Sequence, residues 1–289
     1  MPPMAPSSPE IDTQDFCCYL MAKLIVETCM HFPNFDPVFL RLGPLEFRWY
    51  GLMYIIGFVS AYFIIKAGVR RKNIPLTKDD VADLIFSVAL GVILGGRLGY
   101  ILFYNLSYYL AHPLKFFAVW EGGMSFHGGL TGAVLAGLYY IRKKKIAFYQ
   151  IADIGFLAGP VGLGLGRIGN FINGELYGRV TDVPWGMVFP SGGNLPRHPS
   201  QLYEAFLEGP LMFLVLWLIG KKEHPSGAVF WAFICMYGLF RFIVEFFREP
   251  DSQLGFILDG LSMGQLLSLP MFLVGGGMIV WLYGRRKVR

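Results

Sequence analysis

The sequence predicts an all-α, polytopic integral membrane protein with seven transmembrane helices, its N-terminus outside and its C-terminus in the cytoplasm. Of the 289 residues, 54% are hydrophobic and only 16% are charged, whereas soluble domains are about one quarter charged. The mean hydropathy is +0.49. Long apolar stretches alternate with short clusters of Lys and Arg, a pattern that indicates the number of membrane crossings and their direction.

Seven stretches approach the length of about 20 mostly apolar residues that a helix needs to cross the hydrocarbon core. They are residues 49–65, 84–104, 124–141, 154–166, 202–220, 227–247 and 260–284. The first, third and last contain no Asp, Glu, Lys or Arg, whereas charges interrupt or border the other four near one end. Each stretch is therefore predicted to be a transmembrane helix, and the charges within or beside four of them need an explanation.

Basic clusters follow the first, third, fifth and seventh stretches. They are Lys66, Arg70, Arg71, Lys72 and Lys78; Arg142, Lys143, Lys144 and Lys145; Lys221 and Lys222; and Arg285, Arg286, Lys287 and Arg289. Cytoplasmic loops collect Lys and Arg, so every odd-numbered helix is predicted to end inside. This topology accounts for the net charge of +5, and no nucleic-acid partner is expected.

Residues 1–30 are predicted to be an N-terminal extension outside the core, because they lack the basic start and long apolar core of a signal peptide. Residues 31–289 are predicted to form a single membrane-embedded domain with an external segment near residues 170–200. The four cysteines show no paired spacing, and potential ligands do not group together. No metal and no cofactor are therefore expected.

Glycines recur at four-residue spacing in three of the predicted helices. Such spacing places small residues on one helix face and predicts close helix packing in lipid. The glycines concerned are Gly91, Gly95 and Gly99, then Gly128 and Gly132, and finally Gly162 and Gly166.

Several charges within the apolar stretches are predicted to lie toward the external leaflet. The even-numbered helices run from inside to outside, which places Arg97, Arg167 and Arg241 near their outer ends. An ionised side chain at the bilayer centre costs about 2.5 to 3.5 kcal/mol on insertion scales, so each should face the protein interior and have a partner. Arg48 and Arg248 lie nearer the helix ends, where long side chains can instead reach the interface.

Two interpretations of the deep arginines stay open. Arg241, Glu245 and Arg248 lie on one helix face, and Glu204 and Glu208 form a second stripe. The acids and arginines can therefore form purely structural ion pairs. Alternatively, converging arginines can bind a phosphate, because guanidinium groups bind phosphoryl oxygens bidentately and keep their charge. A phospholipid headgroup in the outer leaflet is the anion expected at this depth.

Neighbouring polar residues extend the phosphate hypothesis. His127 lies in the glycine-rich sequence WEGGMSFHGGL and can accept a proton near neutral pH, although a lone histidine is often structural. Asn170 and Asn173 end the fourth helix and can donate to a headgroup or to exposed helix carbonyls. Tyr50 and Tyr237 either belong to an interfacial aromatic belt or point their hydroxyls inward.

The segment GRIGNFINGELYG, residues 166–178, resembles the signature GR-x-GNF-x-N-x-E-xx-G of the bacterial phosphatidylglycerol:prolipoprotein diacylglyceryl transferases. Further segments that resemble this family are HFPNFDPV, WYGLMY, GGRLGYILFYN, GGMSFHGG, PRHPSQLYE and YGLFRFIVEFFREPD. The resemblance covers about residues 31–284 and leaves only the predicted extension outside.

The resemblance implies a transferase of the bacterial cytoplasmic (inner) membrane. Its implied reaction moves the diacylglyceryl group of phosphatidylglycerol to the thiol of the lipobox cysteine in a prolipoprotein signal peptide, forms a thioether and releases glycerol phosphate. The implied active site lies toward the external leaflet. The implied substrates are a membrane lipid, phosphatidylglycerol, and prolipoproteins. The residues that the resemblance marks are Tyr50, His127, Arg167, Asn170, Glu175, Gly178, Arg241 and Glu245.

Chemistry and resemblance together give the expected site. The arginines hold the phosphate while a base takes the thiol proton. The expected catalytic residues are Arg167, Arg241, His127 and Glu245. The expected substrate-binding residues are Tyr50, Arg97, Asn170, Asn173, Glu175, Gly178, Tyr237 and Arg248. The alternatives are a lipid or anion transporter with an arginine-lined cavity, which predicts access from both faces, and a scaffold in which the charges only pair.

Overall fold

The computed structural model describes residues 30–43, 45–118, 122–249, 256–257 and 261–286. Nearly all of the predicted N-terminal extension, with Cys17, Cys18 and Cys29, lies outside the described residues. The helices are α2 (Trp49–Arg71), α3 (Lys78–Tyr104), α4 (Leu106–Ala111), α5 (Phe126–Lys143), α6 (Phe148–Ile172), α7 (Ser200–Phe206), α8 (Met212–Lys221), α9 (Ala228–Val244) and α10 (Met263–Arg286), with the 3-10 helix η1 (Pro113–Phe117) and the π-helical turn η3 (Leu207–Leu211). The chain is therefore mostly helical.

Short strands depart from the predicted all-α fold. They are β1 (Met30–His31), β2 (Val38–Leu42), β3 (Leu45–Arg48), β4 (Met187–Val188), β5 (Phe256–Ile257) and β6 (Leu261–Ser262). β2 and β3 form an antiparallel hairpin before α2, β5 and β6 pair before α10, and β1 pairs in parallel with β4. In the last pair Met30 lies opposite Met187, so the final residue assigned to the extension contacts the segment between α6 and α7.

A helix lies at each of the seven predicted stretches. Five helical segments are long and apolar enough to cross a membrane: Trp49–Arg71, Lys78–Tyr104, Phe148–Ile172, Ser200–Lys221 and Met263–Arg285. Ala228–Val244 is a shorter apolar helix, and α5 has 18 residues with several glycines. The chain is thus a polytopic membrane protein.

The bounds of α6 differ most from the prediction. The sequence predicts a helix over residues 154–166, whereas α6 extends from Phe148 to Ile172. Asp153 and Asn170, close to the two predicted limits, are buried inside the bundle. Asp153 accepts the backbone N–H groups of Gly227 at 2.8 Å and Phe230 at 3.0 Å, which satisfies free donors at the start of α9.

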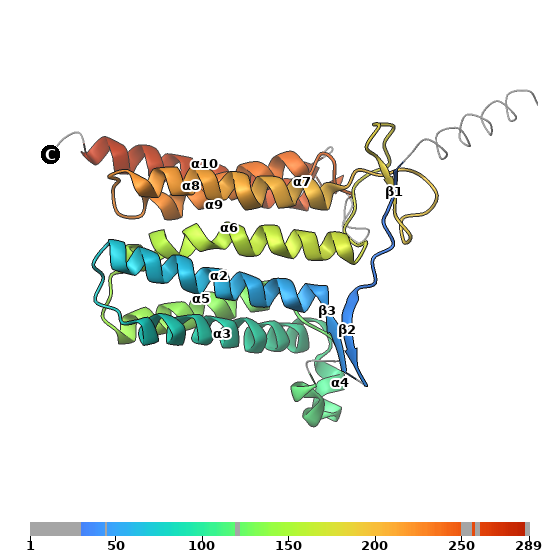
Figure 1. Ribbon diagram of the computed structural model, residues 1–289, viewed down its shortest axis with the longest axis horizontal. Helices are drawn as coiled ribbons and strands as arrows, with labels where there is room; N and C mark the ends of the chain where they lie inside the picture. The colour runs from blue at the N-terminus through green and yellow to red at the C-terminus, as the bar shows by residue number, and fades with distance from the viewer. Residues whose placement is uncertain (1–29, 44, 119–121, 250–255, 258–260, 287–289) are drawn as a thin grey trace, which may run out of the picture.

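The long helices run side by side and alternate in direction (Figure 1). α2, α5, α8 and α10 end at the same side of the bundle, which carries the predicted basic clusters and which we call the basic end. At the opposite side lie β1, β2, β3 and α4 with residues 173–199, and we call this side the head end. α3 packs most extensively on α5, α2 on α6, and α9 on α10.

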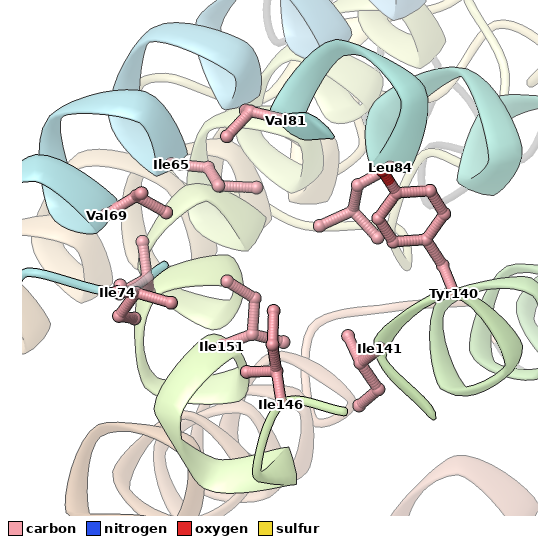
Figure 2. Close-up of a cluster of buried hydrophobic side chains, with 10 residues drawn as sticks. Ile65, Val69, Ile74, Val81, Leu84, Tyr140, Ile141, Ile146 and Ile151 are labelled. Carbon is pink, nitrogen blue, oxygen red and sulfur yellow. The ribbon is translucent and has the colours of Figure 1, made fainter. Parts of the chain in front are cut away.

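A buried aliphatic cluster joins four helices at the basic end (Figure 2). Its labelled members are Ile65, Val69, Ile74, Val81, Leu84, Tyr140, Ile141, Ile146 and Ile151. They come from α2, α3, α5, α6 and the two short turns that connect these helices. This cluster fixes the relative position of the helices at the end away from the head.

The glycine prediction is confirmed for one helix pair and holds in part for α6. A Cβ atom at Gly99 of α3 would lie only 2.8 Å from Cα of Gly128 on α5, so these two helices pack as predicted. At Gly162 and Gly166 of α6 a Cβ would meet no atom within 4 Å. Gly162 nevertheless faces α2, because a Cβ at Gly57 would lie 3.5 Å from Cα of Gly162. The tighter contact of α6 is made by Gly164, where a Cβ would lie 3.0 Å from Cα of Gly209.

Candidate active site

Six charged side chains from three helical segments meet at the head end. We call them the arginine–glutamate cluster, and its members are Arg167 of α6, Glu204 of α7, Glu208 of η3, Arg241 of α9, and Glu245 and Arg248 directly after α9. Each guanidinium lies within ion-pair distance of at least one carboxylate. Arg167 and Arg241, which the sequence predicts to converge, are therefore brought together.

Glu204 is the centre of the cluster. Its Oε2 lies 3.1 Å from Nε of Arg167, and its Oε1 pairs with Nη1 of Arg241 and lies 3.3 Å from Nη1 of Arg248. The Glu204 side chain is fully buried. One carboxylate that serves three guanidinium groups balances charges that would be costly to bury alone. The predicted structural pairing of glutamates with arginines is therefore confirmed.

Two further pairs complete the cluster. Nη2 of Arg241 lies 2.9 Å from Oε2 of Glu245, which confirms the predicted pairing one helical turn apart. Nε of Arg167 lies 3.4 Å from Oε2 of Glu208. α10 covers Glu245, since a Cβ at Gly264 would lie 2.7 Å from both of its carboxylate oxygens. Three guanidinium groups thus face three carboxylates, and the cluster has no net charge.

The π-helical turn η3 positions Glu208. Pro210 cannot donate a backbone hydrogen bond, and Gly209 has the non-helical angles φ −94° and ψ −107°, so the helix widens at this point. Gly209 lies directly against α6, because a Cβ at Gly164 would be 3.0 Å from Cα of Gly209. Arg167 follows Gly164 by about one helical turn, and this close approach brings its side chain to both acids.

Part of the Arg167 guanidinium remains available. Among the described residues only its Nε is paired, and neither Nη makes a hydrogen bond. The Arg167 side chain is 18% exposed, whereas those of Glu204 and Glu208 are fully buried. The two Nη groups therefore form the side of the cluster that can donate to an oxyanion from outside.

Glu175 organises the turn that follows α6. Its Oε1 accepts hydrogen bonds from Nδ2 of Asn170 at 2.9 Å and Nδ2 of Asn173 at 3.1 Å. Its backbone carbonyl accepts from Nε2 of Gln201 at 2.6 Å. Gly174 has a φ of 65°, which glycine adopts without strain and which reverses the chain. The two asparagines thus donate to Glu175, and the network joins α6 to α7.

Gly178 ties residues 173–199 to the end of α9. Its N–H donates to the carbonyl of His198 at 2.8 Å, and its backbone pairs with that of Arg248. A Cβ at this position would lie 2.7 Å from Cβ of His198 and would also meet the carbonyl oxygen of Phe247. The position therefore requires glycine, and it connects the head end to the backbone of a cluster arginine.

His198 lies in this connection and is half-buried. Its Nδ1 is 3.1 Å from the hydroxyl of Tyr203, and its ring packs edge-on against Phe247 at 5.2 Å between centroids. Burial lowers the pKa of His198, and the charge of Asp182 opposes this effect. Burial thus favours the neutral imidazole.

Both predicted tyrosines lie beside the cluster. Tyr50 begins α2, and its ring lies against α6, where a Cβ at Gly169 would be 2.8 Å from Cδ2 of Tyr50. The Tyr50 hydroxyl is 3.3 Å from that of Tyr54. Tyr237 lies on α9 about one helical turn before Arg241. The structure therefore brings these two tyrosines to the arginine–glutamate cluster.

Arg97 has an environment that the sequence did not predict. It is 1% exposed, and its guanidinium donates to five backbone carbonyls, those of Lys115, Phe116, Ala118, Gly122 and Gly123, at 2.5 to 3.2 Å. A guanidinium has five N–H groups, so none remains for a phosphate. In place of the predicted substrate contact, Arg97 anchors the connection between α3 and α5, whose irregular backbone offers free carbonyls.

His127 is exposed in the first turn of α5. Its ring packs edge-on against Phe126 at 5.6 Å between centroids. Within the described part of the chain its ring makes no hydrogen bond or ion pair with the arginine–glutamate cluster. α5 packs mainly on α3, whereas the arginines of the cluster belong to α6 and to α9 with the residues directly after it. His127 therefore reaches the head end on a different pair of helices from the arginines.

Sequence reasoning omitted three buried residues from the expected site. Glu204, Glu208 and Gln201 are all fully buried, and Gln201 Oε1 has no hydrogen-bond partner among the described residues. The signal for the two glutamates was their four-residue spacing within an apolar stretch. This spacing predicts that the two glutamates are partners of the arginines. It does not reveal that these acids determine where the guanidinium groups lie.

Comparison with known proteins adds a family match to this geometry. Residues 37–281 match the family model described as prolipoprotein diacylglyceryl transferase. The phosphatidylglycerol–prolipoprotein diacylglyceryl transferase of Geobacter sulfurreducens is 71% identical over 259 residues, which cover 90% of this chain and 99% of that protein. Proteins of the same name from Photobacterium profundum and Bordetella avium are 54% and 55% identical, over 87% and 89% of this chain and 95% and 98% of their own lengths.

Proposed function

We propose a mechanism from one premise: the chain belongs to the prolipoprotein diacylglyceryl transferase family. It is a membrane transferase of lipoprotein biosynthesis with phosphatidylglycerol–prolipoprotein diacylglyceryl transferase activity. The observation that carries the mechanism is that Arg167 and Arg241 converge on one buried carboxylate while both Nη groups of Arg167 stay available. We assign this cluster to the phosphate of phosphatidylglycerol.

The orientation of the chain follows from its basic end. With all seven helices crossing the bilayer, the basic end faces the cytoplasm and the head end faces the outside of the bacterial inner membrane. The arginine–glutamate cluster then lies at the depth of the external leaflet. The gathering of these charges near one end favours a transferase over a transporter, which needs access from both faces.

The phosphate contact supports bond cleavage as well as binding. The Nη groups of Arg167 donate to two phosphate oxygens, and Arg241 adds a second positive charge beside them. When the C–O bond between the diacylglyceryl carbon and the phosphate breaks, the electron pair leaves with glycerol phosphate. Fixed guanidinium groups in a site with little water stabilise this developing charge more in the transition state than in the ground state.

The nucleophile is the thiolate of the lipobox cysteine in the prolipoprotein signal peptide. A thiol must lose its proton before it attacks, and the new C–S bond forms on the carbon that loses the phosphate. We assign the proton to His127, whose ring is unpaired among the described residues, rather than to Glu245, which Arg241 holds at 2.9 Å. Residues 173–199 lie at the head end with this site. We assign them the role of positioning the peptide.

Lipid transfer by the purified protein tests this assignment. Nanodiscs with labelled phosphatidylglycerol are mixed with a lipobox peptide that carries Cys or Ser at the acceptor position. Arg167→Lys keeps the charge but loses the bidentate donor, and we expect kcat/KM to fall by about a hundredfold or more. Arg41→Gln is the matched control, since Arg41 forms an exposed ion pair with Asp36 before α2.

Two results would contradict the mechanism. One is a rate near wild type for Arg167→Lys and Arg241→Lys proteins that keep the wild-type unfolding temperature. The other is equal lipidation of the Cys and Ser peptides, which would remove the thiolate from the reaction. Transport of labelled lipid across the bilayer without lipidation of either peptide would favour the transporter.

A further inference from the structure

A second polar site lies at the basic end, far along the bundle from the head. An open pocket of about 600 Å³ is bounded by the end of α2, the start of α6 and the connection between α8 and α9. Its cationic side chains are Arg71, Lys72, Lys221 and Lys222, and they outnumber the carboxylates of Asp153 and Glu223. The transferase mechanism uses none of these residues.

Buried polar contacts hold this pocket in shape. The side chains of His224 and Asp153 are 6% and 2% exposed, and His224 Nδ1 lies 3.8 Å from a carboxylate oxygen of Asp153. His224 Nε2 is 3.3 Å from Nζ of Lys72, and Nη2 of Arg71 donates to the carbonyl of Gly220 at 2.9 Å. Two cations at the end of α2, Arg71 and the following Lys72, are thus held against the connection between α8 and α9.

The pocket keeps an excess of positive charge, because its four cations outnumber its two carboxylates. Asp153 already accepts two backbone N–H groups at the start of α9. In the part of the chain that the structure describes, the side chain of Lys222 forms no hydrogen bond or ion pair, and the residue is exposed. Burial lowers the pKa of Lys72, and the nearby charge of Arg71 acts in the same direction, although Asp153 opposes both. An anion in the pocket would relieve this repulsion.

Topology alone does not explain the arrangement. Basic residues that only fix orientation lie on solvated loops, whereas here a buried His and Asp hold cations around a concave site. An exposed apolar path runs along α8 through Leu214, Trp217 and Leu218, which are 50%, 38% and 46% exposed. It reaches the pocket at Trp217, whose ring centroid lies 4.9 Å from Nζ of the pocket residue Lys221. Acyl chains can lie on this path while a phosphate reaches the cations, which favours a lipid over a soluble anion.

We propose that this basic-end pocket binds the headgroup phosphate of an anionic phospholipid in the leaflet opposite the one that supplies the transferase site. Basic pockets between transmembrane helices on the cytoplasmic side recognise such headgroups. The bound lipid bridges α2 to the connection between α8 and α9. It therefore stabilises the bundle without taking part in the transfer reaction.

Native mass spectrometry of the full chain with phosphatidylglycerol tests the proposal, because it counts bound lipids. The wild-type protein is expected to retain two lipids and the Lys72→Gln/Lys222→Glu protein only one, with the second affinity weakened by about tenfold or more. Transfer activity at saturating lipid should stay unchanged, which shows that the substrate site is intact. Lys143→Gln/Lys144→Gln is the matched control, since neither lysine lines the pocket.

The thermal unfolding temperature distinguishes the possible ligands. Phosphatidylglycerol should raise it more in the wild type than in the Lys72→Gln/Lys222→Glu protein, and zwitterionic phosphatidylethanolamine should have no such effect. The proposal is overturned if both proteins bind the same number of lipids, if phosphatidylethanolamine binds equally well, or if inorganic phosphate stabilises the wild type as much as the lipid does. The single variant Lys222→Glu, at an exposed position, repeats the test if the double variant does not fold.

Discussion

Replacement of Glu204 by Gln is the most direct perturbation of the candidate site. Gln has nearly the same size as Glu and keeps one carbonyl oxygen, but it removes the only negative charge that contacts all three arginines. Arg167 keeps its contact with Glu208 and Arg241 keeps Glu245. Arg248 has no other carboxylate contact among the described residues.

The expected cost follows from burial. Removing one partner of a buried ion pair costs about 3 to 5 kcal/mol, because the remaining charge is left without compensation. The remaining carbonyl oxygen of Gln still accepts one hydrogen bond, worth about 1 kcal/mol. We therefore expect Glu204→Gln to lower the free energy of unfolding by about 3 kcal/mol, toward the lower limit of that range.

Thermal unfolding in detergent micelles measures this loss. Glu249→Gln is the matched control, because Glu249 pairs with Arg197 at 2.9 Å but its side chain is 50% exposed, and exposed pairs contribute about 0 to 1 kcal/mol. Adding Arg248→Gln to Glu204→Gln should restore part of the stability, since it removes the unpaired cation. If Glu204→Gln lowers the free energy of unfolding no more than Glu249→Gln does, the carboxylate of Glu204 does not hold the cluster together.

Three further predictions concern the head end. Arg97→Met leaves five carbonyls without a donor, and each that stays buried and unpaired costs about 1 to 3 kcal/mol. We therefore expect rapid proteolysis between α3 and α5. Resistance to proteolysis equal to that of the wild type would refute the anchoring role of Arg97. Gly178→Ala should destabilise the protein by about 1 to 3 kcal/mol through overpacking and raise KM for the peptide, and an unchanged unfolding temperature would contradict this. The pKa of His198 is lowered in the folded state, so the unfolded chain binds the proton more readily and stability should fall as the pH drops below about 7. His198→Asn should abolish that pH dependence, and an unchanged slope would assign it to another group.

Much of the fold follows from the sequence, because an apolar stretch in a membrane has few alternatives to a helix. The convergence of Arg167 with Arg241 was predictable for a related reason, since deep charges need partners and the glutamates stood at helical spacing. The partner of Arg97 was not predictable. A guanidinium can donate its hydrogen bonds to the carbonyls of an irregular loop as readily as to a phosphate. Sequence spacing does not distinguish these two environments.

The tightest contact of α6 was also beyond the sequence. The face of α6 that packs closely is set by the π-helical turn η3 and its Gly209, which no periodicity in residues 154–166 reveals. The same limit explains the bounds of α6, because a polar residue such as Asp153 ends a predicted helix unless a distant segment satisfies it.

Glu204 and Glu208 have opposite roles in the charge balance of the cluster, since Glu204 holds all three arginines together whereas Glu208 competes with the phosphate. The cluster has no excess positive charge to balance the negative charge of a phosphate diester. Binding of the diester therefore depends on the available Nη groups of Arg167. Glu208 opposes it, since its Oε2 lies 3.4 Å from Nε of Arg167 and its Oε1 has no hydrogen-bond partner among the described residues. Glu208→Gln should therefore lower KM for phosphatidylglycerol by about tenfold, or about 1.4 kcal/mol, with little change in kcat. A higher KM would show instead that Glu208 orients Arg167 for the lipid, and the competition between carboxylate and phosphate would be excluded.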